Sequence, residues 1–181
     1  IGGVSANGGI DDNDSLDLSI SAFLGDDSVS EGSAAIFTLS LSNPSATPTE
    51  VSLNTLTGGS NTAAASDVSA LEYYDGSNWL PVVDGKITIP ANSTSIWIRV
   101  PTTQDGVYEG KETFQLQATL NGQTVTGNGS IVDDGTGVVP PEVPNTPSDE
   151  GVPDDDRPLV QSISDASAVE GKEALVFDVT L

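Results

Sequence analysis

Carboxylates are the residues of this 181-residue chain whose type and spacing could do chemistry, because it has 27 acidic residues and neither histidine nor cysteine. Many of them stand in turns and beside apolar segments, while segments such as 36–41 and 114–120 carry none. This set comprises Asp26, Asp27, Glu31, Asp67, Asp105, Glu109, Glu112, Asp133 and Asp134. Carboxylates that gather repel one another unless a cation neutralises them. Calcium, which takes roughly 6–8 oxygen ligands, suits such a set better than magnesium. A merely solvated acidic surface is the equal alternative.

The net charge of −22 excludes several other functions. Five basic residues cannot neutralise a row of phosphates, so we expect no nucleic-acid partner. Histidine or thiol catalysis, zinc binding by Cys or His, and disulfides are excluded by composition. No apolar run approaches the ~20 residues of a membrane span, so we expect no membrane insertion.

Apolar and polar residues alternate along the segments between the acidic turns. Phe37, Leu39 and Leu41 alternate with Thr38 and Ser40, and four further segments follow the same rule. Such a period of two is typical of half-buried strands, and Gly, Asn and Asp residues mark the turns between them. We therefore predict an all-β fold, an antiparallel Ig-like β-sandwich of about seven strands over residues 15–135. One small sandwich offers no large cleft, so we expect no enzyme.

The composition divides the rest of the chain into three segments. Residues 1–14 form an acidic lead-in or the end of a preceding repeat, and residues 136–156 are rich in proline and acidic residues. We interpret 136–156 as a semi-extended linker, with an ordered loop folded over the domain as the alternative. Residues 157–181 repeat earlier motifs: S-x-x-E-G occurs at 28–32 and at 167–171, and F-x-x-x-L at 37–41 and at 177–181. They are interpreted as the first strands of an incomplete next repeat in a tandem array. If these strands are ordered, we predict that they pair with a neighbouring molecule or with further segments.

Four segments together resemble the Calx-beta domain. They are Glu31-Gly32, residues 65–68 (ASDV), residues 104–114 (QDGVYEGKETF) and residues 129–134 (GSIVDD). This version is similar to the repeats of large bacterial adhesins exported by type I secretion, the RTX adhesins. The resemblance implies calcium ligands that converge at one end of the sandwich, near the next domain.

The ligands that the resemblance implies are Glu31, Asp67, Asp105, the backbone carbonyl of Val107, Glu109, Glu112, Asp133 and Asp134. Gln104 departs from the family, which often has an acidic residue there. Asp26 and Asp27 lie outside the shared motif. For the run Asp154–Asp156, a solvated charge run is favoured over a calcium site at the entry of the next repeat.

These expectations combine into a calcium-stabilised structural spacer of a secreted adhesin on the bacterial cell surface, in cell adhesion or biofilm formation. Its partners would be calcium and adjacent repeats of the same chain. One alternative is a glycan-binding module that uses Tyr73, Tyr74, Trp79 or Trp97, although cross-strand aromatic packing explains the first three more simply. The other alternative is a regulatory calcium sensor.

Overall fold

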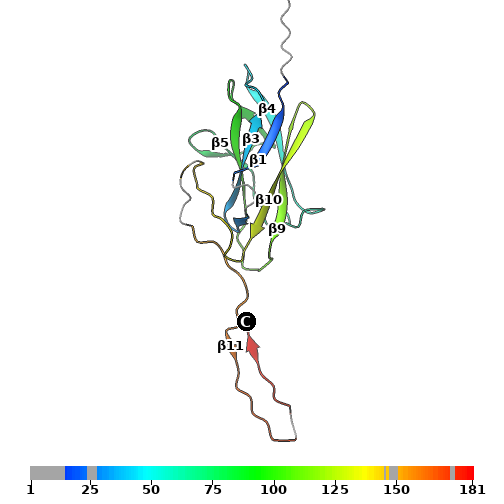
Figure 1. The fold of residues 1–181 in the computed structure, drawn as a ribbon, viewed down its shortest axis with the longest axis vertical. Coiled ribbons are helices and arrows are strands. Elements are labelled where there is room, and N and C mark those ends of the chain that lie inside the picture. Colours follow the sequence, from blue (N-terminus) through cyan, green and yellow to red (C-terminus); the bar gives the residue numbers. More distant parts are fainter. Residues whose placement is uncertain (1–14, 24–27, 145, 147–150, 172–173) are drawn as a thin grey trace, which may run out of the picture.

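The protein folds into an all-β sandwich followed by a separate hairpin (Figure 1). The computed structural model describes residues 15–23, 28–144, 146, 151–171 and 174–181. The lead-in at 1–14, together with Asp26 and Asp27, lies outside the described residues. The described ranges contain no helix, and therefore no helix long and apolar enough to cross a membrane.

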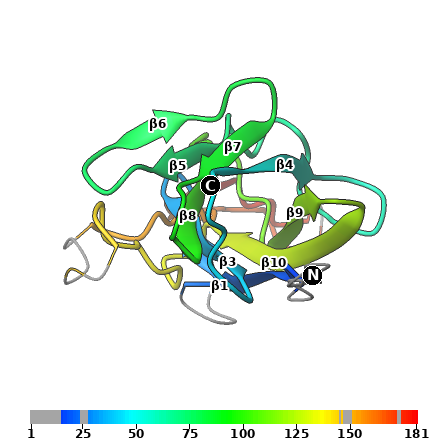
Figure 2. The ribbon, with the colours of Figure 1, turned by 90° about the horizontal axis from the view of Figure 1, so that it is seen from above.

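Two five-stranded sheets pack face to face, as the view in Figure 2 shows. The first has the order β1 (Leu18–Ala22), β3 (Ala34–Leu41), β8 (Ser95–Pro101), β5 (Glu72–Tyr74) and β6 (Trp79–Pro81). The second has the order β2 (Val29–Ser30), β10 (Gln123–Val132), β9 (Glu112–Leu120), β4 (Thr49–Leu56) and β7 (Lys86–Ile89). The sandwich thus has ten strands where about seven were expected. The difference matches three very short strands, β2, β5 and β6.

The core lies between the sheets and follows the predicted alternation. Phe37 and Leu39 on β3, and Phe114 and Leu116 on β9, are fully buried. The rings of Phe37 and Phe114 meet edge to face across the two layers, with centroids 6.3 Å apart. Gly129 on β10 makes room for this contact, because a Cβ atom there would lie 2.3 Å from the Phe114 ring.

The parallel pairing of β2 with β10 positions the acidic end of the sandwich. All other strand pairs are antiparallel. Because Val132 pairs with Ser30, the next residues of the two strands, Asp133 and Glu31, leave the sheet side by side. The backbone N–H of Glu31 donates to the carbonyl of Val132 at 2.9 Å. β9 begins at Glu112 on the other side of β10, so three strand ends bring acidic residues together.

The described part of 136–156 differs from the semi-extended linker that we expected, since it folds back over the sandwich. Val138 forms a parallel bridge with Val29, and Trp79 Nε1 donates to the carbonyl of Glu142 at 2.6 Å. This loop covers the outer face of the first sheet, because Ile36, which points away from the core, is only 5% exposed and lines a pocket together with Val139 and Pro140. Figure 1 shows the loop beside the sandwich. The physical reason is that apolar outer-face residues and Arg99, which pairs with Glu142, give the proline-rich segment a surface to pack on.

Residues 157–181 form a hairpin in which β11 (Ser162–Ile163) pairs with β12 (Val179–Thr180). Its register matches that of β1 and β3: Ser162 faces Thr180 as Ser19 faces Ser40, and Ile163 faces Val179 as Ile20 faces Leu39. The two strands pair with each other. The division of the chain into repeats, and any further pairing of this hairpin, stay predictions.

Candidate metal centre

Five carboxylates line a small pocket at the end of the sandwich where β2 and β10 stop. They are Glu31, Asp67, Glu109, Glu112 and Asp133, accompanied by Gly110 and Ile131. The pocket has a volume of about 10 Å³, which is roughly the space for one water molecule or ion. All its charged lining groups are carboxylates, and their oxygens are the ligands that a hard cation prefers.

Asp133 is the most deeply buried of these residues, with 3% of its surface exposed. Its Oδ2 accepts a hydrogen bond from the backbone N–H of Glu109 at 2.9 Å. Its Oδ1 is buried and has no hydrogen-bond partner among the described residues. An unsatisfied buried polar group costs about 1–3 kcal/mol, and more when it is charged. The geometry therefore leaves one carboxylate oxygen available for a ligand.

Asp67, Glu109 and Glu112 bring carboxylate oxygens within 4.8 Å of one another. Asp67 is fixed in its turn, because its carboxylate accepts from the backbone N–H of Ala64 at 2.5 Å and from Ser66 Oγ at 2.9 Å. Burial is the largest cause that raises the pKa of Glu112 to about 7, and the hydrogen bond and charge of Asp67 and the charges of Glu109 and Glu31 contribute to the same rise. Burial, followed by the charges of Asp67, Asp105 and Asp133, also raises the pKa of Glu109.

Glu31 stands beside Asp133 and is held by the turn that follows β2. Gly32 has a φ of +74°, and a Cβ atom there would lie 2.8 Å from Gln104 Oε1, so both the turn and its neighbour require glycine. The pKa of Glu31 is raised to about 7, chiefly by burial; the hydrogen bond from the backbone N–H of Asp105 opposes this rise, and nearby acidic charges add to it. Ionised carboxylates are thus costly at this end of the sandwich unless a cation joins them.

Three of the ligands implied by the resemblance lie aside from the pocket lining. The carboxylate of Asp105 is exposed and accepts from the backbone N–H of Val107 at 2.7 Å, closing a turn. Val107 itself is 60% exposed. Asp134 accepts hydrogen bonds from the backbone N–H and hydroxyl of Thr136, which lower its pKa. The structure brings the other five predicted residues together; calcium binding by any of the eight stays a prediction.

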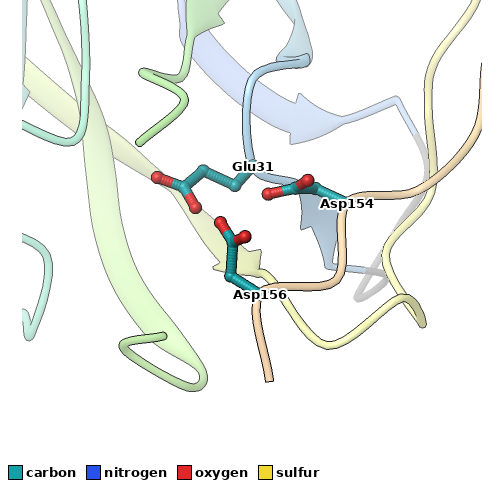
Figure 3. Close-up of side chains that lie close together, drawn as sticks. All are labelled: Glu31, Asp154 and Asp156. Atoms are coloured by element: carbon teal, nitrogen blue, oxygen red, sulfur yellow. The ribbon is translucent and has the colours of Figure 1, made fainter. Parts of the chain in front are cut away.

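The structure also brings together Asp154 and Asp156, for which a solvated charge run was favoured; their carboxylate oxygens come within 4.8 Å of Glu31 and of each other (Figure 3). The run of three aspartates contained a usable signal. In extended backbone, side chains alternate between two sides, so the first and third members face the same way. The position of that face beside Glu31 depends on the folded-back loop.

The aromatic residues of the β5–β6 hairpin pack on one another, as the cross-strand interpretation predicts. Tyr74 pairs with Trp79, with ring centroids 5.2 Å apart, and lies 5.8 Å from Trp97. The guanidinium of Arg99 lies 4.7 Å from the centre of the Trp79 ring. These contacts stabilise the outer face of the first sheet under the loop.

Comparisons with known proteins give fold likeness only. No protein-family model and no curated protein sequence matches the chain. Among solved structures, CBD12 from CALX1.2 is 16% identical over 64% of this chain and 44% of its own length, with a TM-score of 0.44. The apo-form Calx CBD1 domain is 17% identical over 65% of this chain and 97% of its own, also with a TM-score of 0.44. A family 123 glycoside hydrolase from Clostridium perfringens has a TM-score of 0.40 at 12% identity, over 68% of this chain and 28% of its own. The chain spans less than half of the CBD12 structure, and likeness at these values carries no ligand or activity to it.

Proposed function

We propose that the sandwich is a calcium-stabilised structural spacer of a large secreted bacterial adhesin. The observation that carries the calcium part is the buried, unpartnered Oδ1 of Asp133 in a pocket with four other carboxylates. The adhesin part is supported by the sequence resemblance to RTX adhesin repeats and by the repeated motifs at 28–41 and 167–181.

A calcium ion would be held by Asp67, Glu109, Glu112 and Asp133, with Glu31 at the edge of the pocket. Its two positive charges would stabilise the ionised forms of Glu31 and Glu112, whose pKa values are raised by burial first and by neighbouring acidic residues second. These residues come from the ends of β2 and β10, the start of β9 and two turns, so one ion would tie five segments of chain. Binding only to the folded state stabilises that state by mass action.

The proposed location is the bacterial cell surface, where calcium at ~10⁻⁴–10⁻³ M would load a site of the affinity usual for extracellular modules. In a low-calcium cytoplasm the same linkage would favour the unfolded chain, which suits export as an unfolded polymer. The proposed role is mechanical: loaded repeats are stiff, and adjacent repeats of the same chain form a rod for adhesion or biofilm formation. No catalysis is proposed.

Thermal unfolding in millimolar calcium and in EGTA tests this function. At about 1 mM calcium, one site with a dissociation constant of ~10⁻⁴–10⁻³ M is expected to stabilise the folded chain by about 0.4–1.4 kcal/mol. Asp133→Asn keeps the shape and the hydrogen bond to Glu109 but removes the charge, so most of the calcium effect should disappear. Asp165→Asn serves as the matched control, because it removes one negative charge from an exposed residue of the hairpin.

Identical melting of the unaltered chain in calcium and in EGTA would refute the calcium part.

Asp134→Asn tests whether a residue that the resemblance implies as a ligand, but that does not line the pocket, contributes to calcium binding. Because the Asp134 carboxylate is engaged by Thr136, we expect this variant to keep most of its calcium response.

A further inference from the structure

The segment 139–144 of the folded-back loop is rich in proline and lies against the outer face of the first sheet. Its sequence is V-P-P-E-V-P. Pro140, Pro141 and Pro144 are buried, whereas the two residues between the last two prolines are exposed. Polyproline II backbone has three residues per turn, so Pro141 and Pro144 lie on the same side of an extended segment. The burial pattern therefore matches a polyproline segment that turns one side toward the sheet.

Two side chains of the sheet bind this segment at one residue, Glu142. Trp79 Nε1 donates to the backbone carbonyl of Glu142 at 2.6 Å, and Arg99 Nη1 donates to its carboxylate at 3.1 Å. Polyproline II backbone makes no hydrogen bonds of its own, so its carbonyls are available to such a donor. The indole thus binds the extended backbone, while the guanidinium binds an acidic side chain at the same position.

Trp79 and Arg99 are fixed by contacts within the sheet. Tyr74 pairs with Trp79 across β5 and β6, with ring centroids 5.2 Å apart. The guanidinium of Arg99 lies 4.7 Å from the centre of the Trp79 ring and donates to Glu72 on the neighbouring strand. Because β5, β6 and β8 supply all these groups, the surface is organised independently of the segment that it holds.

The segment covers this face of the sheet without filling the space beneath it. A pocket of about 550 Å³ remains, and its lining includes Ile36, Arg99 and Pro101 from the sheet and Val139, Pro140 and Pro141 from the segment. Protein interiors leave few voids larger than a water molecule, so the segment is packed less closely than the core. A few directed contacts hold it, rather than continuous packing.

The loop is attached to the sandwich on both sides of the segment by contacts that involve neither Trp79 nor Arg99. Val138 forms a parallel bridge with Val29, and the backbone N–H of Asp154 donates to Ser30 Oγ at 2.7 Å. The segment 139–144 can therefore leave the sheet while both attachments remain. These attachments also give the segment a high effective concentration at its site, so it competes strongly with a free peptide.

We infer that the outer face of the first sheet, at Trp79 and Arg99, is a recognition site for proline-rich peptides of the pattern P-P-E-x-P, which the chain's own segment 139–144 occupies. The partner that fits this site is an extended segment with two prolines three residues apart and a carboxylate directly after the first of them. Such a partner takes the place of the chain's own segment when that segment is released. Trp79 and Arg99 lie outside the acidic pocket, so this binding goes beyond the calcium function.

Hydrogen exchange of the Trp79 indole N–H reports whether the segment is bound. The indole of Trp97, the other tryptophan of the chain, is the internal reference. The double variant Pro141→Ala/Pro144→Ala loses two buried rings and the backbone restriction of proline, so exchange at Trp79 should become about tenfold faster. Equal rates in the unaltered chain and in the double variant would overturn the binding of the segment at this site.

Two further variants separate release of the segment from a general loosening of the fold. Pro44→Ala/Pro48→Ala changes two exposed prolines between β3 and β4 and should leave the exchange at Trp79 unchanged. Glu142→Gln alters a side chain that is 74% exposed and removes its ion pair with Arg99, so exchange should become about two- to fivefold faster at an unchanged melting temperature. Equal acceleration in the control with exposed prolines would overturn the site.

A synthetic peptide of residues 138–144 tests recognition between separate molecules. Added to the Pro141→Ala/Pro144→Ala chain, it should bind with one equivalent in calorimetric titration and restore slow exchange of the Trp79 indole. The peptide with alanine at both of these proline positions should bind at least about tenfold more weakly. Trp79→Phe, introduced into the same chain, keeps an aromatic ring but removes the donor, so it should weaken binding about three- to tenfold. Absence of binding, or equal binding of the two peptides, would overturn the recognition site.

Discussion

Two antiparallel strand pairs of this molecule have the same register and opposite surroundings. β1 and β3 pair inside the sandwich, and β11 and β12 pair outside it, with Ser19–Ser40 and Ser162–Thr180 as equivalent pairs. Phe37 in the first is fully buried, whereas Phe177, its counterpart by sequence, is 54% exposed. Pairing of the two strands is thus encoded locally, while burial requires the strands of a second sheet.

The same contrast holds for the carboxylates that precede the two turn glycines. Gly32 and Gly171 have φ values of +74° and +77°, so the E-G turn has the same local geometry in both copies. Glu31 shares a pocket with four other acidic residues, but Glu170 is exposed. The motif therefore specifies the turn, whereas the remaining strands supply the other carboxylates that make the pocket around Glu31.

Replacement of the two equivalent phenylalanines should give the largest difference between the two strand pairs. Phe37→Ala removes a fully buried ring and its contact with Phe114, and we expect a loss of about 3–5 kcal/mol in the free energy of unfolding. Phe177→Ala, in the exposed hairpin, should change that free energy by less than about 0.5 kcal/mol. Urea unfolding followed by tryptophan fluorescence measures both. Equal losses would mean that the hairpin is packed in solution as tightly as the sandwich.

Glu31→Gln and Glu170→Gln test the contrast at the level of charge. The first removes a carboxylate from the pocket, so calcium affinity should fall by about tenfold or more, which is about 1.4 kcal/mol. The second removes the equivalent carboxylate from an exposed turn and should leave the affinity unchanged. Calorimetric titration compares them directly, and a similar loss in both would show that the hairpin contributes ligands.

The pH dependence should give the effect most confined to the sandwich. Folding raises the pKa of Glu31 and Glu112 from 4.5 to about 7, so the folded state binds protons more tightly than the unfolded state between these values. Their contribution to stability is fully present below pH 4.5 and is lost as the pH rises through 7. In EGTA, the melting temperature should therefore decline over this interval.

Calcium should abolish this trend, because a bound cation favours the ionised carboxylates. With saturating calcium the decline in melting temperature between pH 4.5 and 7 should disappear. Calcium affinity should in turn weaken as the pH falls below 7. A decline of equal size with and without calcium would place the titrating groups elsewhere in the protein.

Local pattern was sufficient to predict most of the sandwich. The alternation that contains Phe37, Leu39 and Leu41 needs only a period of two, and it correctly indicated which side chains face the core. Glu31, Asp67, Glu109, Glu112 and Asp133 were all named in advance, and they do line one pocket. The loop over the first sheet could not be read in the same way, because proline-rich acidic composition says nothing about the surface on which it packs.

The sequence by itself determined the alternation of the strands, the glycine turn after Glu31 and the excess of negative charge, since each depends on neighbouring residues alone. Tertiary structure decided which carboxylates meet. The parallel pairing of β2 with β10 placed Glu31 beside Asp133, and the folded-back loop joined Asp154 to Ser30 across 124 residues of chain. Contacts between segments so far apart depend on how two sheets and a loop pack together. The alternation of apolar and polar residues along a single strand carries no information about that packing.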